Sequence, residues 1–223
     1  MGAEGPRDAH AGALPPRTAG AAVAFVAAPG PRPAAPLGFL PLLRAATPDD
    51  ARPIVALLAA VASEHTLGVD PAGFREEEEA ARLAQLDLAR ACALVAERGG
   101  AVTGFALAVR GAEPATAHTA AVSVAVARED RGHGLGRLLL GGLESWARAA
   151  GLRKLCAGVV AGNHAALRLF HARGYAPEGL RRQQVAIAGR LCDEVLLGRV
   201  LEEGGAAGTA PLGARRPRGG APR

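Results

Sequence analysis

Aromatic residues are scarce in this chain: they make up 3% of its 223 residues, with one tryptophan, one tyrosine and five phenylalanines. Hydrophobic residues still account for 49%, so aliphatic side chains and alanine must form the core. No run approaches the ~18 consecutive apolar residues of a membrane span, and we therefore expect a soluble protein that does not bind membranes. The length favours one domain of ordinary size.

Cysteine is equally scarce, and the three cysteines, Cys92, Cys156 and Cys192, lie far apart. Their spacing matches neither a zinc site nor a disulfide framework. We therefore predict small buried side chains in a reducing compartment, the cytoplasm, and no bound metal.

Lysine is nearly absent, because Lys154 is the only lysine among the 26 basic residues. Residues 1–43 and 202–223 hold seven of the basic residues and four of the acidic ones, so residues 44–201 carry a net charge of only +2. The excess positive charge lies mainly at the two ends of the chain. A basic face that binds nucleic acid is therefore not indicated.

Both ends are rich in alanine, glycine and proline, a composition that buries too little apolar surface to offset the entropy of ordering. We predict disordered tails at 1–43 and 202–223 and a folded domain at 44–201. The apolar stretch 19–28 follows Arg17 and leaves a targeting segment open. A flexible tail or a misplaced start codon is the favoured interpretation, because the segment has no serine and Arg17 lies late.

Between the tails, alternating patterns predict an α/β domain with a mixed sheet. Thr47-Pro48-Asp49-Asp50 is typical of a helix start, with Thr47 as N-cap and proline at the first helical position. Asp70-Pro71 is a second start signal, and the glycine pair after residue 98 predicts a hairpin. The expected helices cover 48–61, 72–90, 135–150 and 163–172, and the expected strands cover 43–46, 92–97, 102–109, 120–127, 154–160, 182–189 and 191–200.

The strongest candidate for a ligand site is Arg131-Gly132-His133-Gly134-Leu135-Gly136-Arg137, between an expected strand and an expected helix. Glycines let the backbone approach a ligand, and a helix N-terminus presents unpaired N–H groups and a partial positive charge. We therefore predict a phosphate or pyrophosphate site. A P-loop would end in Gly-Lys-Ser/Thr, and a dinucleotide fingerprint would need glycine at Arg137. The remaining pattern is R-x-x-G-x-G, formed by Arg131, Gly134 and Gly136.

Two blocks of sequence carry a family resemblance. Val126-Ala-Arg-Glu-Asp-Arg131-Gly-His-Gly134-Leu-Gly136 resembles the acetyl-CoA loop of the GNAT superfamily of N-acetyltransferases. Asn163-His-Ala-Ala166-Leu-Arg-Leu-Phe170-His-Ala-Arg-Gly174-Tyr175 is similar to that family's N-x-x-A-x-x-L-[YF]-x-x-x-G-[FY] segment. The resemblance covers about 44–201. It implies one α/β (α+β) domain with a mixed, mostly antiparallel, twisted sheet flanked by helices and splayed open at the cofactor strand.

The resemblance also implies acetyl-CoA as co-substrate. Backbone amides of 132–137 would hold the pyrophosphate, with Arg131 or Arg137 adding charge. The strand that ends at Val126 would pair with the pantetheine arm, and a backbone N–H there, with Val126 as a candidate, would polarise the thioester carbonyl. Asn163 would touch the CoA arm, cap its helix, or do both. The implied cofactor-binding residues are Val124, Ala125, Val126, Arg131, Gly132, His133, Gly134, Leu135, Gly136, Arg137 and Asn163.

The sequence does not identify the catalytic side chains. Phe170 stands where many relatives carry a tyrosine as general acid, and phenylalanine cannot donate a proton. The expected strand 120–127 has no carboxylate, and we expect Glu129 and Asp130 at the solvent edge of the loop. His133 has a suitable intrinsic pKa, but we expect it to face solvent or phosphate. A water molecule that relays a proton to an unidentified carboxylate remains an equal alternative.

The implied reaction is direct attack of a neutral primary amine on the acetyl group, without a cysteine nucleophile. The C-terminal part, 178–197, resembles relatives that acetylate small amines, amino acids or protein N-termini, and the acceptor is expected between 64–70 and the last hairpin. The main alternative is a non-catalytic acyl-CoA-binding or regulatory module, motivated by Phe170 and the missing base. An enzyme that binds a different nucleotide at the glycine loop is a second alternative, and a homodimer is left open.

Overall fold

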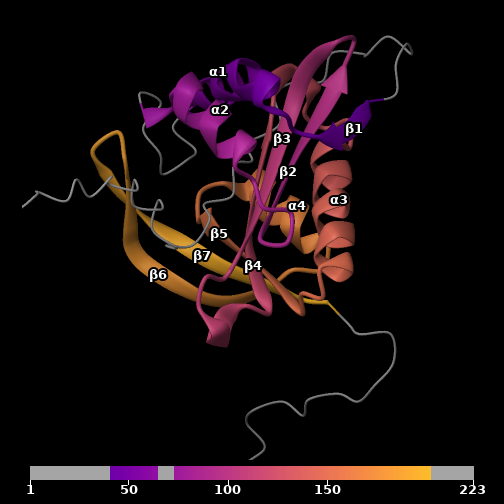
Figure 1. The fold of residues 1–223 in the computed structure, drawn as a ribbon. Coiled ribbons are helices and arrows are strands. Elements are labelled where there is room, and N and C mark those ends of the chain that lie inside the picture. The colour runs from indigo at the N-terminus through magenta and orange to yellow at the C-terminus, as the bar shows by residue number, and fades with distance from the viewer. Residues whose placement is uncertain (1–40, 65–72, 202–223) are drawn as a thin grey trace, which may run out of the picture.

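The computed structural model describes residues 41–64 and 73–201. Within them, seven strands form one sheet in the order β1-β2-β3-β4-β5-β7-β6 (Figure 1). The predicted tails, apart from residues 41–43, and the start signal Asp70-Pro71 lie outside the described residues. The strands are β1 Leu42–Ala45, β2 Ala91–Arg98, β3 Ala101–Arg110, β4 Thr119–Val126, β5 Lys154–Val160, β6 Ala176–Ile187 and β7 Arg190–Val200.

The helices α1 Ala51–Ala62, α3 Leu135–Ala149 and α4 His164–His171 lie where the sequence predicts them. A 3-10 turn, Pro48–Asp50, leads into α1. Thr47 begins that turn, and both its backbone N–H (2.8 Å) and its hydroxyl (3.0 Å) donate to Oδ2 of Asp50. The predicted helix start is therefore confirmed, although its first turn is 3-10 rather than α-helical.

Two predicted boundaries are wrong. The helix expected at 72–90 is α2, Glu76–Ala84. It ends early because the carbonyl of Asp87 accepts from the N–H groups of Arg90 and Ala91, which turns the chain into β2. β6 begins at Ala176 rather than at 182. The prediction missed this start because the pairing of β6 with β7 is interrupted between Arg181 and Val185, which hides the period-two pattern.

All neighbouring strands are antiparallel except β4 and β5. Among the described residues, β4 and β5 pair only at 119–121 with 154–156. Beyond this short ladder the two strands separate. The mixed, mostly antiparallel sheet and its opening at β4 are therefore as predicted.

The two faces of the sheet carry different helices (Figure 1). On the α3 face, α3 and α4 pack on Val122, Val124 and Val126 of β4. On the α1 face, α1 and α2 pack on Ala125 and on Phe105 of β3. These clusters cover opposite sides of β4 because successive side chains of a strand alternate in direction.

Candidate active site

The free edge of β4 begins where β5 leaves it. Gly104 pairs with Val126, and the next residue, Ala127, donates its N–H to the carbonyl of Thr103 at 2.8 Å. This pattern makes Gly104–Val126 a non-hydrogen-bonded pair of the antiparallel ladder, so the N–H and C=O of Val126 point away from β3. By alternation, the backbone groups of Val124 do the same. The predicted pantetheine and oxyanion positions therefore present their backbone groups to the side on which β5 has separated.

The glycine loop leads from this edge into α3. Gly132 and Gly134 have φ of +80° and +86°, and a Cβ built at either one would meet no atom within 4 Å. Gly134 is the N-cap of α3 and offers no side chain to the first-turn amides, which are left without intrahelical partners. Open space in front of free N–H groups at a helix N-terminus fits a pyrophosphate.

The two arginines of the loop lie in different surroundings. Arg137 is exposed. The Arg131 side chain is only 4% exposed, and its guanidinium makes a bidentate ion pair with Glu64 at 2.7 and 2.8 Å. Its Nε also donates to the carbonyl of Val126 at 2.9 Å. Arg131 thus joins the end of α1 to the end of β4.

Asn163 lies at the start of α4, and its Oδ1 accepts from the N–H of Ala166 at 3.1 Å. Its predicted capping role is confirmed, and its contact with the CoA arm stays a prediction. The side chain is buried, because Asn163 lies between β5 and α4.

Phe170 and Tyr175 form a T-shaped pair with ring centroids 4.9 Å apart. Both rings are buried in the α3-face cluster. The hydroxyl of Tyr175 is fully buried and has no hydrogen-bond partner in the described structure. Burial raises the pKa of Tyr175 above its usual range, so we do not assign an acid–base role to this tyrosine. Tyr175 packs directly before β6, which begins at Ala176.

Two loop carboxylates differ from each other. Glu129 is exposed, as predicted. The prediction for Asp130 is wrong: this side chain is buried, and its Oδ1 accepts from Arg98 at 2.7 Å. The side chain of Arg98, on the neighbouring hairpin, reaches across to it, a contact that cannot be read from local sequence.

The histidines do not supply an enclosed base within the described residues. His118, His133, His164 and His171 are all exposed. His65, which belongs to the predicted acceptor loop, lies outside the part of the chain that the structure describes. The described cysteines are free, and burial raises the pKa of the Cys92 thiol to about 11.

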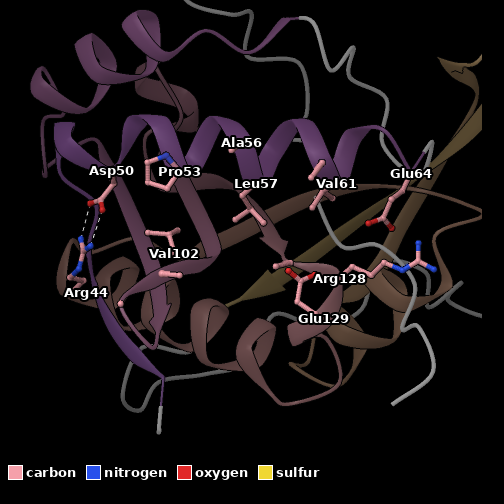
Figure 2. Close-up of a pocket in the computed structure, with 14 residues that line it drawn as sticks. Arg44, Asp50, Pro53, Ala56, Leu57, Val61, Glu64, Val102, Arg128 and Glu129 are labelled. Atoms are coloured by element: carbon pink, nitrogen blue, oxygen red, sulfur yellow. Dashed lines mark hydrogen bonds and ion pairs between the residues drawn. The ribbon is translucent and has the colours of Figure 1, made fainter. Parts of the chain in front are cut away.

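A groove of about 450 Å³ runs along α1 (Figure 2). Leu57 and Val61 line it, the Arg44–Asp50 ion pair lies at one end, and Glu64 lies at the other. None of the predicted cofactor residues lines this groove. The groove nevertheless adjoins the end of β4, because Ala127, Arg128 and Glu129 line it and Glu64 pairs with Arg131.

Sequence reasoning missed two carboxylates that the fold buries or pairs. Glu64 holds Arg131, 67 residues away. Glu194, on β7, is 2% exposed. A local pattern gives no signal for either one, because both contacts depend on long-range packing.

The described residues contain neither a metal-binding cluster nor a membrane-spanning helix. No group of three or more His, Cys, Asp or Glu residues is arranged to hold a metal ion. No helix in this part of the chain is long and apolar enough to cross a bilayer.

The sequence model of the acetyltransferase (GNAT) family matches residues 58–175. A comparison with curated proteins gives no match. Among solved structures, a GNAT-family acetyltransferase of Streptococcus pneumoniae is 28% identical, with a TM-score of 0.67, and the match covers 73% of this chain and 100% of that one. The ribosomal-protein-alanine N-acetyltransferase of Brucella melitensis is 31% identical, with a TM-score of 0.66 and coverage of 72% and 99%. A phosphinothricin acetyltransferase of Sinorhizobium meliloti, in complex with acetyl-CoA, is 27% identical, with a TM-score of 0.68 and coverage of 79% and 96%.

Proposed function

The chain belongs to the GNAT family of acetyltransferases, and from this premise we propose that it transfers the acetyl group of acetyl-CoA to a primary amine. The free edge of β4 carries the proposal, because it leads directly to the open amides at the start of α3. An extended pantetheine arm can pair with such an edge as an added strand would. A pyrophosphate can bind the amides of 132–137.

The two arginines of the glycine loop, Arg131 and Arg137, have different roles. Arg137 is exposed at the helix start and supplies positive charge to the phosphates. Arg131 supports the loop from beneath, because its guanidinium is held by Glu64 and by the Val126 carbonyl. Asn163 fixes the start of α4 beside the pantetheine arm.

In the reaction, the neutral amine nitrogen attacks the thioester carbonyl carbon and the C–S bond breaks. A backbone N–H of Val124 or Val126 stabilises the negative charge that develops on the carbonyl oxygen. Phe170 donates no proton to the leaving thiolate. A thiol with a pKa of about 8.5 is a tolerable leaving group near neutral pH, so transfer proceeds without that acid.

Two of the solved relatives support the proposed acceptor class. One is named for the alanine of a ribosomal protein and the other for phosphinothricin, and both compounds present a primary amine. We therefore propose a small amine, an amino acid or a protein N-terminus as the acceptor, and a cytoplasmic reaction without a metal.

Calorimetric titration of acetyl-CoA into the full chain tests the cofactor site, with NAD as the control ligand. We compare Gly134→Glu with Gly151→Glu, at opposite ends of α3. Both glycines have positive φ, 86° and 69°, and open space for a side chain, so the backbone strain is matched. A carboxylate at 134 would face the phosphates, and we expect affinity to fall about 100-fold or more, as like charges in contact cost several kcal/mol. Gly151→Glu should bind normally.

If folded Gly134→Glu binds acetyl-CoA as tightly as Gly151→Glu, the assignment of the cradle is wrong. Tight binding without consumption of acetyl-CoA, across a broad panel of amines, would instead favour the non-catalytic acyl-CoA-binding module.

A further inference from the structure

Glu194 lies on the α1 face of the sheet, on β7, which pairs with the far side of β5 from the opening between β4 and β5. It pairs directly with Val160 at the end of β5, and directly opposed residues point to the same side of a sheet. Ala121 of β4 pairs with Cys156 of β5, and Cys156 pairs with Gly198 of β7, so these three side chains point to the same face. Every second residue of a strand shares a face, which places Glu194 on the same face as Ser123 and Ala125. Ala125 belongs to the cluster that packs on α1.

The charge of Glu194 is poorly compensated in comparison with the other deeply buried glutamate. Glu144 and Glu194 are each 2% exposed. Glu144 accepts from Nε and Nη2 of Arg173 and pairs with Arg199 at 2.5 Å. Among the described residues, Glu194 has one side-chain partner: Nη1 of Arg181 donates to Oε2 at 3.2 Å, and that arginine side chain is 43% exposed. A buried carboxylate is costly unless positive charge and hydrogen-bond donors compensate it.

The second oxygen of Glu194 has no partner among the described residues. Ser123 is 4% exposed, and its hydroxyl also has no partner there. Tyr175 Oη is the only fully enclosed side-chain oxygen or nitrogen in the described structure that lacks one. The free oxygens of Glu194 and Ser123 therefore both border space that solvent can reach, on the same face of the sheet.

We propose that Glu194 is the carboxylate that binds the acceptor ammonium and removes its proton, directly or through one water molecule. An ammonium supplies what Oε1 lacks: a positive charge and an N–H donor. The acceptor is thus a primary amine that arrives protonated, and this inference rests on the proposed acetyl transfer.

One proton passes from R–NH₃⁺ to the Glu194 carboxylate and leaves R–NH₂. The nitrogen lone pair forms the C–N bond at the thioester carbonyl, and the C–S electron pair leaves with the thiolate of CoA. The nitrogen of the new amide releases its extra proton to solvent, and the thiolate takes up one proton from solvent. Glu194 then releases its proton to solvent and is again a carboxylate, so one proton is set free in each turnover.

The test measures acetyl-CoA consumption by the full chain with two probes, methylamine and an alanine-initiated tetrapeptide. We expect Glu194→Gln to lower kcat/KM for the better probe about 100-fold, the lower range for loss of a general base. Its remaining rate should rise about tenfold per pH unit with the fraction of neutral amine, whereas the wild type should rise less steeply. Acetyl-CoA affinity should stay within about twofold, because Glu194 lies outside the cradle.

Two variants separate this role from a structural one. Glu178→Gln is the matched control, because Glu178 is a glutamate of the same hairpin that pairs with Lys154. Arg181→Met removes the only side chain in the described structure that donates to Glu194, and both variants should keep most of the turnover. If Arg181→Met loses as much as Glu194→Gln, the pair is structural and the proposal is overturned.

Two further results would overturn the role of Glu194, and a third would overturn the proposed acetyl transfer. A Glu194→Gln rate within threefold of the wild type overturns the proposal, as does a wild type that binds acetyl-CoA but consumes it no faster with either probe. Failure of the wild type to bind acetyl-CoA would instead overturn the proposed function itself.

Discussion

The α3 face and the α1 face of the sheet both bury charged groups, but they differ in how these charges are paired. On the α3 face, Glu144 accepts from Arg173 and Arg199, which belong to the segment after α4 and to β7. On the α1 face, Glu64 holds the glycine loop through Arg131, and Glu194 has a single exposed arginine. A well-compensated charge stabilises the packing around it, whereas a poorly compensated one leaves interaction energy for a ligand.

The hydrophobic clusters show the same difference. The α3-face cluster runs without a break from β2 across to β7. The α1-face cluster ends at β4, and beyond the opening only a small group around Val160, Val185 and Ile187 continues on the hairpin. We therefore expect substitutions on the α3 face to change stability, and those on the α1 face to change binding or turnover.

The largest effect should come from Glu144→Ala, which leaves Arg173 and Arg199 without their shared carboxylate. We expect the free energy of unfolding to fall by about 3 kcal/mol, the lower end for breaking a buried ion pair, because both arginines keep some solvent contact. Urea denaturation measures this loss.

The matched control is Glu178→Gln, whose pair with Lys154 is much more exposed and should contribute less than about 1 kcal/mol. Equal losses in the two variants would mean that burial does not distinguish the two ion pairs.

An intermediate effect is expected at Asp50, which ties the start of α1 to β1 through Arg44. Hydrogen bonds from Arg44 lower the pKa of Asp50 from 3.8 to about 2. The pair therefore stabilises the fold fully above about pH 5, and this contribution is lost as the pH falls through 4 towards 2. Asp50→Asn should cost about 1–2 kcal/mol at pH 7, a value reduced by solvent screening because Arg44 is 33% exposed.

Urea unfolding of both proteins at several pH values measures the difference. A gap between wild type and Asp50→Asn that stays constant from pH 7 to pH 2 contradicts the assignment.

The smallest effect should come from the pair that supports the glycine loop. If Arg131 acts by holding Glu64, then Glu64→Gln and Arg131→Gln should each weaken acetyl-CoA binding about fivefold, and the double variant no further. Calorimetry on the four proteins of this cycle gives the coupling. A much larger loss for Arg131→Gln, additive with that of Glu64→Gln, would instead indicate a direct contact with phosphate.

Local features of the fold were predictable from sequence. Thr47 and Asp50 mark the start of the first helix, and Asn163 caps α4, because such interactions involve residues only three positions apart. The R-x-x-G-x-G loop was predictable for the same reason, since its glycines and the helix that follows are contiguous. The start of β6 was not, because a break in its pairing masks the alternation of side chains.

Sequence patterns were thus enough to predict the succession of strands and helices along the chain, the glycine loop at the start of α3 and the family resemblance. Periodicity, caps and turns act over a few residues and can be read directly. The folded arrangement was needed to show where β5 leaves β4, which face each side chain occupies, and which carboxylates are paired. The Arg131–Glu64 pair joins residues 67 positions apart, and Glu194 gains its surroundings from three strands. Burial and charge compensation depend on such distant neighbours, so they exist only once the chain has folded.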